Sequence, residues 1–200
     1  MRLGFSVFRG RLPRLVLATL AWLPLAFAVW YFAGPLLAFL VKLIVEPVSR
    51  LAFGDIVSAV EQQGSTLIFV TKLRPGDALA AGNVSVDVDT LLYAYGMPMF
   101  AALTLAAREP RWPQKLLVGL LVMLPLVSFG MIADCLKNVV FSAGPLVTSQ
   151  AGFSATARDA IAFSYQFGAL IMPTVAPAAL WVLLHRRLLE SLRDEPNAPA

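Results

Sequence analysis

Four residues that could take part in catalysis lie at the ends of two long apolar stretches. Asp134, Cys135 and Lys137 occur within four positions of one another, and the only histidine is His185. Charged side chains at the end of an apolar segment suggest a functional site by default. A cysteine nucleophile also needs a base, such as histidine, within hydrogen-bonding reach. Whether Cys135 and His185 can meet depends on the elements that carry them.

The composition excludes most classes of soluble protein. Of 200 residues, 58% are apolar and 14% are charged, whereas a globular domain carries about 25% charged residues. A chain of this length has too little interior to hide so much apolar surface from water. A soluble enzyme, a disordered tail and a disulfide scaffold are therefore excluded, and the sequence predicts an integral membrane protein.

Four stretches are long and apolar enough to cross a bilayer, whose hydrocarbon core of about 30 Å requires about 20 helical residues. Each contains at least one proline, which membrane helices tolerate because neighbouring helices and waters satisfy the freed carbonyl. The sequence therefore predicts a mainly α, polytopic membrane protein with four kinked transmembrane helices. The predicted spans are residues 15–34, 91–107, 116–135 and 167–185.

The basic residues predict the orientation of these spans. Ten of the sixteen lie in the N-terminus (1–14), the connection 108–115 and the tail (186–200). Basic residues favour the cytoplasmic side, so both termini are expected inside. Cys135 and His185 then lie about 30 Å apart, on opposite sides of the membrane. We therefore predict no catalytic residue. One cysteine and one histidine also exclude a Cys/His zinc cluster, and we expect no metal and no cofactor.

The first outward connection combines a helix with a small β region. Lys42, Glu46 and Arg50 recur every four residues and so share one face of a helix over 35–54. This helix is either interfacial or a continuation of the first span, and the sequence leaves both open. In the region 55–90, a meander of three strands is predicted, and its apolar face must rest on the membrane surface, this helix or a partner. The predicted strands are 57–62, 66–73 and 84–89.

The second outward connection, 136–166, contains the start of another helix. Thr156 and Asp159 have the spacing of a capping box, which predicts a helix start near Thr156. Charged candidates for an outer-face site are Asp134, Lys137, Arg158 and Asp159. Because Asp134 and Lys137 are three residues apart near the interface, we favour a structural ion pair over a functional role.

Four segments resemble the family of exosortase H-associated membrane proteins of Gram-negative bacteria. The similarity covers nearly the whole chain, and none of its pieces is a catalytic signature. The segments are WLPLAFAVWYFAGPLL, VEQQGSTLIFVTKL, DVDTLLYAYGMPMFAALTLA and FSYQFGALIMPTVAPAALW.

The resemblance implies an accessory role in the inner membrane. Exosortases are membrane enzymes that use Cys, Arg and His to process a C-terminal sorting tail. This chain lacks such a set of residues in a workable arrangement, so it resembles a non-catalytic partner. The resemblance implies that it binds the exosortase or its tail-bearing cargo at the outer face of the membrane. We expect no binding of nucleic acid. The contact residues that we expect are Glu61, Gln62, Gln63, Gly64, Tyr93, Tyr95, Gly96 and Pro98.

Two other functions remain open from the sequence. The first is an independent membrane enzyme that acts on lipid or peptide at the outer face through Glu61 and the charged candidates. The second is a small channel or transporter, for which four spans with few buried charges offer no convincing ion path.

Overall fold

The computed structural model describes residues 11–75 and 82–194. The first ten residues of the predicted basic N-terminus, residues 76–81 of the predicted β region and the last six residues of the predicted tail lie outside the described residues. Two π-helical turns, Asn138–Ser142 and Phe167–Ile171, extend α5 and join α7 to α8. The elements are α1 (Arg11–Phe32), α2 (Gly34–Phe53), β1 (Val57–Gln63), β2 (Thr66–Thr71), β3 (Ser85–Asp89), α3 (Thr90–Ala94), α4 (Gly96–Ala107), α5 (Trp112–Lys137), α6 (Pro145–Ala151), α7 (Ala155–Gln166), α8 (Met172–Leu184) and α9 (Arg186–Asp194).

Four helical segments have the length and apolar composition of membrane spans. They are Leu12–Phe32, Thr90–Ala107, Trp112–Ser142 and Ala155–Leu184. A three-stranded antiparallel sheet lies between the first and the second of them in the chain. The predicted fold class, a mainly helical membrane protein with four spans and a small β region, is therefore confirmed.

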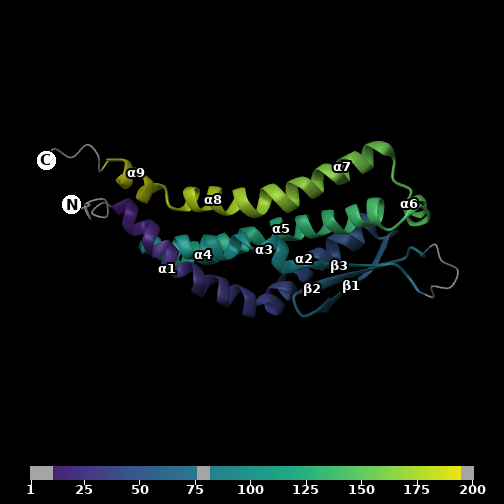
Figure 1. The fold of residues 1–200 in the computed structure, drawn as a ribbon, viewed down its shortest axis with the longest axis horizontal. Coiled ribbons are helices and arrows are strands. Elements are labelled where there is room, and N and C mark those ends of the chain that lie inside the picture. The colour runs from purple at the N-terminus through teal and green to yellow at the C-terminus, as the bar shows by residue number, and fades with distance from the viewer. Residues whose placement is uncertain (1–10, 76–81, 195–200) are drawn as a thin grey trace, which may run out of the picture.

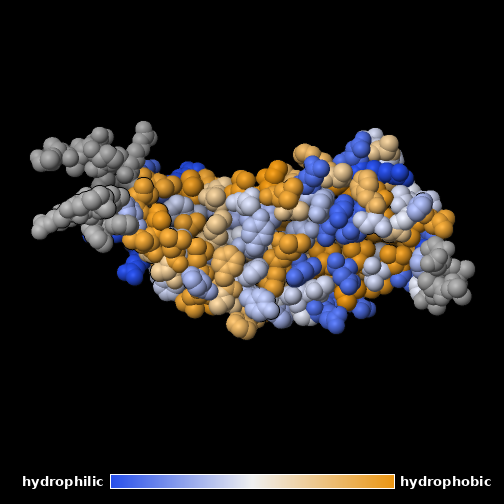
Figure 2. Space-filling view, viewed as in Figure 1, coloured by the Kyte–Doolittle hydropathy of each residue, from blue (hydrophilic) through white to orange (hydrophobic). Residues whose placement is uncertain are grey.

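The molecule is elongated, and its two ends differ in character. Figure 1 shows α9 and the start of α1 at one end, and the sheet, α6 and the start of α7 at the other. In Figure 2, apolar residues prevail over the end that carries α1, α4 and α8, whereas hydrophilic residues gather towards the sheet. We call the end that carries α9 the inner end and the end that carries the sheet the outer end.

Helix α2 is a separate helix that packs on protein. The break falls at Ala33, and Pro35 occupies the first turn of α2, where a missing N–H is tolerated. The buried face of α2 includes Ala38, Val41 and Val45, and the helix contacts β1 and α5. The side next to this buried face carries the predicted charged stripe, in which Glu46 pairs with Arg50 at 2.7 Å.

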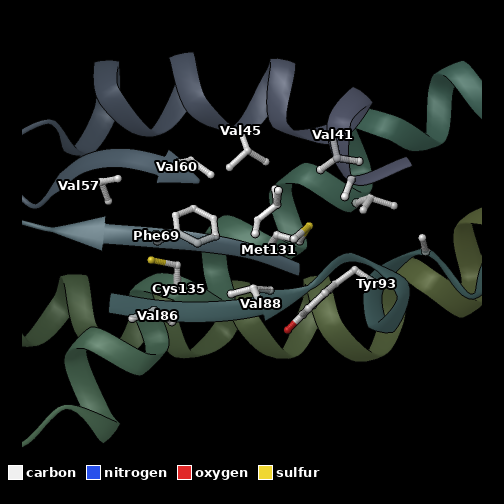
Figure 3. Packing of buried hydrophobic residues seen from close by; sticks show 14 of the residues in the cluster. Val41, Val45, Val57, Val60, Phe69, Val86, Val88, Tyr93, Met131 and Cys135 are labelled. Atoms are coloured by element: carbon white, nitrogen blue, oxygen red, sulfur yellow. The ribbon is translucent and has the colours of Figure 1, made fainter. Parts of the chain in front are cut away.

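The sheet rests its apolar face on α2 and α5. The strands run in the order β1-β2-β3, and the register aligns Val60, Phe69 and Val86 across the three strands. Alternate residues of a strand point to one face, and these three are buried in one cluster with residues of α2 and α5 (Figure 3). The contact with two helices gives the short sheet the support that it lacks alone.

Helix α7 begins at Ala155, one residue from the predicted start near Thr156, but its capping residue differs from the predicted one. Ser154 is the N-cap residue, and its hydroxyl accepts a hydrogen bond from the Ala157 amide at 3.2 Å. Thr156, the predicted cap, lies inside the first turn and is exposed. The cap therefore lies two residues before Thr156, because the Ser154 hydroxyl satisfies a free amide of the first turn.

Candidate functional site

A cluster of polar side chains joins three helices near the outer ends of the spans. The Lys137 ammonium lies 3.3 Å from the Asp134 carboxylate and 4.5 Å from the centre of the Tyr165 ring. Asn138 donates to the same carboxylate at 3.1 Å, and the Tyr93 hydroxyl also hydrogen-bonds to it. We call these five residues the polar cluster. It unites Tyr93, which the sequence suggested as a contact residue, with Asp134 and Lys137, which the sequence suggested as an ion pair.

Local structure brings the three helices of the polar cluster together. Asp89 ends β3 and caps α3 by accepting from the Leu91 amide at 3.0 Å, which fixes the helix that carries Tyr93. On the other side, a Cβ atom at Gly168 would lie 2.8 Å from the Gly130 Cα atom. This glycine contact lets α5 approach the π-helical turn after α7, as small residues do in membrane helix packing.

The polar cluster is partnered within the protein and holds no nucleophile. Cys135 follows Asp134 in the chain, but its side chain is buried in the apolar cluster that includes Phe69, and is 1% exposed. Figure 3 shows it among the valines of α2 and the sheet. His185 follows α8 at the inner end of the molecule, whereas Cys135 lies in the last part of α5 towards the outer end (Figure 1). The structure therefore does not bring the two together.

The predicted contact residues of the β1–β2 hairpin divide into exposed and structural ones. Glu61, Gln63 and Gly64 are exposed, and Gly64 has a φ of 61°, a conformation that favours glycine. Gln62 instead donates from Nε2 to the Pro35 carbonyl at 2.8 Å. Its amide thus ties the hairpin to the start of α2.

The remaining candidates lie apart from the polar cluster. Gly96 is buried against α8, and Tyr95 is half-buried at the break between α3 and α4. Pro98 lines an apolar groove of about 220 Å³ between α1, α2 and α4. Arg158 donates to the Phe153 carbonyl at 3.2 Å, and Asp159 is exposed.

A larger groove at the outer end of the molecule was not predicted. It has a volume of about 470 Å³ and lies between α2 and α7, with α5 as its floor. We call it the outer groove. Its lining is apolar or small; Val48 and Phe129 within it are 43% and 41% exposed. The lining residues are Ile44, Val48, Phe53, Pro125, Ser128, Phe129, Ile132, Ala133, Leu136, Ala160, Ile161 and Ser164.

The outer groove had one weak signal in the sequence. Ala160 and Ser164 are small residues four positions apart, a spacing that permits close approach of a second helix. The α2 wall had none, because nothing in the sequence alone places Val48 opposite α7.

At the inner end, His185 is fully buried and stacked on Trp181, with ring centres 5.0 Å apart. Its Nδ1 lies 3.0 Å from the Trp181 carbonyl oxygen, so Nδ1 carries the proton and Nε2 is bare. Nε2 faces Glu109 at 3.8 Å, and Glu109 pairs with Lys115. Burial lowers the pKa of His185 below its ordinary value, and the nearby Lys115 charge lowers it further. The Trp181 carbonyl and the Glu109 carboxylate act in the opposite direction and raise this pKa.

We therefore expect the stability of the purified protein to fall in mild acid. A histidine whose pKa is lowered by folding binds its proton more readily in the unfolded state. The stability that the neutral His185 contributes is therefore fully present above the unfolded pKa of about 6.5, and it is lost as the pH falls below that value. Thermal unfolding in mild detergent from about pH 8 to about pH 5 measures this loss. His185→Phe keeps an aromatic ring on Trp181 and should flatten the profile; an unchanged profile would contradict the assignment.

Comparison with known proteins places the chain in a family. The family model described as exosortase H-associated membrane protein matches residues 9–188, which is 180 of the 200 residues. No curated protein and no solved structure matches the chain. The match confirms the resemblance seen in the sequence, and the chain belongs to the exosortase H-associated membrane protein family.

Proposed function

We propose that this protein is a non-catalytic partner of an exosortase in the bacterial inner membrane, and that its outer groove binds a transmembrane helix of the enzyme. The family description supports an exosortase as the partner. The observation that carries the proposal is the outer groove, because it is apolar, open and built from three helices.

The charges support an orientation with both termini in the cytoplasm. Five basic residues lie in the connection after α4, in the first turn of α5 and at the start of α9, next to the inner ends of the spans. Basic residues favour the cytoplasmic side, so the outer end would face the periplasm. The residues are Arg108, Arg111, Lys115, Arg186 and Arg187.

The outer groove extends beyond the bilayer in this orientation. About 20 helical residues cross the hydrocarbon core. Counted from their inner ends, the third span, which begins at Trp112, leaves the core near Met131, and the fourth span, which ends at Leu184, leaves it near Tyr165. Helix α2 is not among the candidate spans. Val48 on its groove-facing side is 43% exposed, and an exposed apolar patch marks an interaction site.

A helix is the occupant that the outer groove fits best. The walls run along α2 and α7, so the groove follows helices rather than a sheet edge. Ala160 and Ser164 on one wall, with Ser128 and Ala133 on the floor, leave room for a second helix backbone. A transmembrane helix of the enzyme has the apolar surface to fill it, and Glu61, Gln63 and Gly64 of the hairpin are a second contact that we propose.

The polar cluster does not favour the alternative of an independent membrane enzyme. A general acid or base needs access to the substrate proton, whereas the Asp134 carboxylate is already bound by Lys137, Asn138 and Tyr93. We propose that the cluster positions α3, α5 and α7 relative to one another.

A cysteine substitution tests the non-catalytic role. Cys135→Ala should leave the processing of sorting tails at the wild-type level in cells that carry the exosortase, because the thiol only fills space in the core. Processing is followed by the size of a tail-bearing protein, and the amount of the variant in the membrane is the control. Loss of processing with a normal amount of protein would contradict the proposal.

A further inference from the structure

A second hollow lies at the inner end of the molecule, far from the outer groove. It has a volume of about 600 Å³ and lies between the connection Arg108–Arg111 with the start of α5 and the junction of α8 with α9. Its charged lining residues are Glu109, Arg111, Lys115, Arg186 and Arg187. We call it the basic hollow.

The described residues leave the charge of the basic hollow unbalanced. Glu109 is its one acidic lining residue and pairs with Lys115. Arg111, Arg186 and Arg187 form no ion pair with any described residue. Three guanidinium groups therefore line a shared space for which the described residues supply no anion beyond Glu109. Guanidinium groups suit the oxygens of a phosphate, which they can bind in a bidentate manner.

The position of the basic hollow points to the membrane as the source of that phosphate. The second span ends at Ala107, the third begins at Trp112 and the fourth ends at Leu184, so the hollow lies where three spans meet the headgroup layer. Its remaining lining includes Leu183 and Leu184, and Leu183 is 51% exposed. The hollow thus combines basic residues with exposed apolar ones. This combination suits a phospholipid, whose phosphate is joined to acyl chains, better than a free anion.

The connection that holds Arg111 also has an unusual backbone. Arg108 and Arg111 are non-glycine residues with φ of 48° and 62°, in the left-handed region that L-residues rarely adopt. They flank Glu109, whose ion pair with Lys115 ties the connection to the first turn of α5.

We propose that the basic hollow binds the headgroup of an anionic phospholipid, with Arg111, Arg186 and Arg187 on the phosphate and Leu183 against the acyl chains. Basic pockets between spans on the cytoplasmic side are the common sites for such lipids. The proposal does not depend on the exosortase, because it concerns the opposite end of the molecule.

Lipid titration of the purified full-length protein in mild detergent tests the proposal. Cardiolipin or phosphatidylglycerol should raise the unfolding temperature in a saturable way, whereas phosphatidylcholine and inorganic phosphate should not. Arg186→Gln with Arg187→Gln should weaken the apparent lipid affinity about 30-fold, since each basic residue near the surface contributes about a fivefold effect. Arg111→Gln, on the opposite wall of the basic hollow, should also weaken the apparent lipid affinity.

The matched control removes the same charge from the outer end. Arg50→Gln with Arg74→Gln changes two exposed arginines that do not line the basic hollow, and should leave the lipid affinity at the wild-type value. Equal stabilisation by phosphatidylcholine, full stabilisation by inorganic phosphate alone, or equal losses in the two double variants would each overturn the proposal.

Discussion

Gly96→Val is expected to destabilise the protein more than any other single substitution considered, by about 3 kcal/mol. A Cβ atom at Gly96 would lie 2.2 Å from the Pro173 carbonyl oxygen and 2.4 Å from Pro177 Cγ, far inside the contact distance of about 3.5 Å for carbon atoms. The obstacle is backbone and a proline ring, neither of which can rotate away. Helices α4 and α8 would have to separate.

The two prolines explain why this contact exists. Pro177 lacks an N–H, so the carbonyl of Pro173, four residues earlier, has no helical donor. The free carbonyl faces α4 at Gly96, where only a residue without a side chain permits the approach. The sequence suggested Gly96 as a partner contact, but the structure places it inside the protein.

The measurement is the midpoint of thermal unfolding in mild detergent. Ala178→Val is the matched control, because Ala178 lies on α8 and is exposed; it adds apolar volume to the same helix and should shift the midpoint little. A Gly96→Val protein with the wild-type midpoint would mean that α4 and α8 do not pack as described.

Ala160→Trp is expected to prevent the exosortase from co-purifying with this protein. The indole would occupy the outer groove, where Ala160 is an exposed lining residue of α7. Obstruction at the centre of an interface costs about 2 kcal/mol or more, which is about 30-fold in Kd. The amount of exosortase recovered per molecule of this protein, from membranes solubilised in mild detergent, measures the effect.

Two further variants separate obstruction from misfolding. Gln166→Trp places the same side chain on α7 at an exposed position that does not line the outer groove, and should leave the recovery unchanged. Val48→Glu, from the α2 wall, should reduce recovery as Ala160→Trp does. If both groove variants recovered the enzyme at the wild-type level, the outer groove would not be its binding site.

The sequence was sufficient for the elements whose signal is local. Apolar length predicted four spans, and the alternation of Val84, Val86 and Val88 predicted a strand that the structure contains as Ser85–Asp89. The likeness to the family was also carried by local segments. These features depend on neighbouring residues, so they need no knowledge of the three-dimensional contacts.

Features that depend on contacts between distant segments were not predictable. The sequence left open what the sheet packs on, and the answer, α2 and α5, depends on Val41 and Met131 meeting Phe69 in one cluster. Tyr93 and Asp134 were both singled out, but their contact across α3 and α5 was not foreseen. The outer groove and the basic hollow are likewise formed by residues far apart in the chain.

The most direct test of the exosortase interaction is photo-crosslinking in intact membranes. A photoreactive amino acid replaces Ala160 in one protein and Gln166 in another, and the exosortase is detected in the crosslinked products. The outer groove predicts a crosslink to the exosortase from position 160 and little or none from position 166. A crosslink from 166 alone, or none from either position while the exosortase is present, would contradict the account.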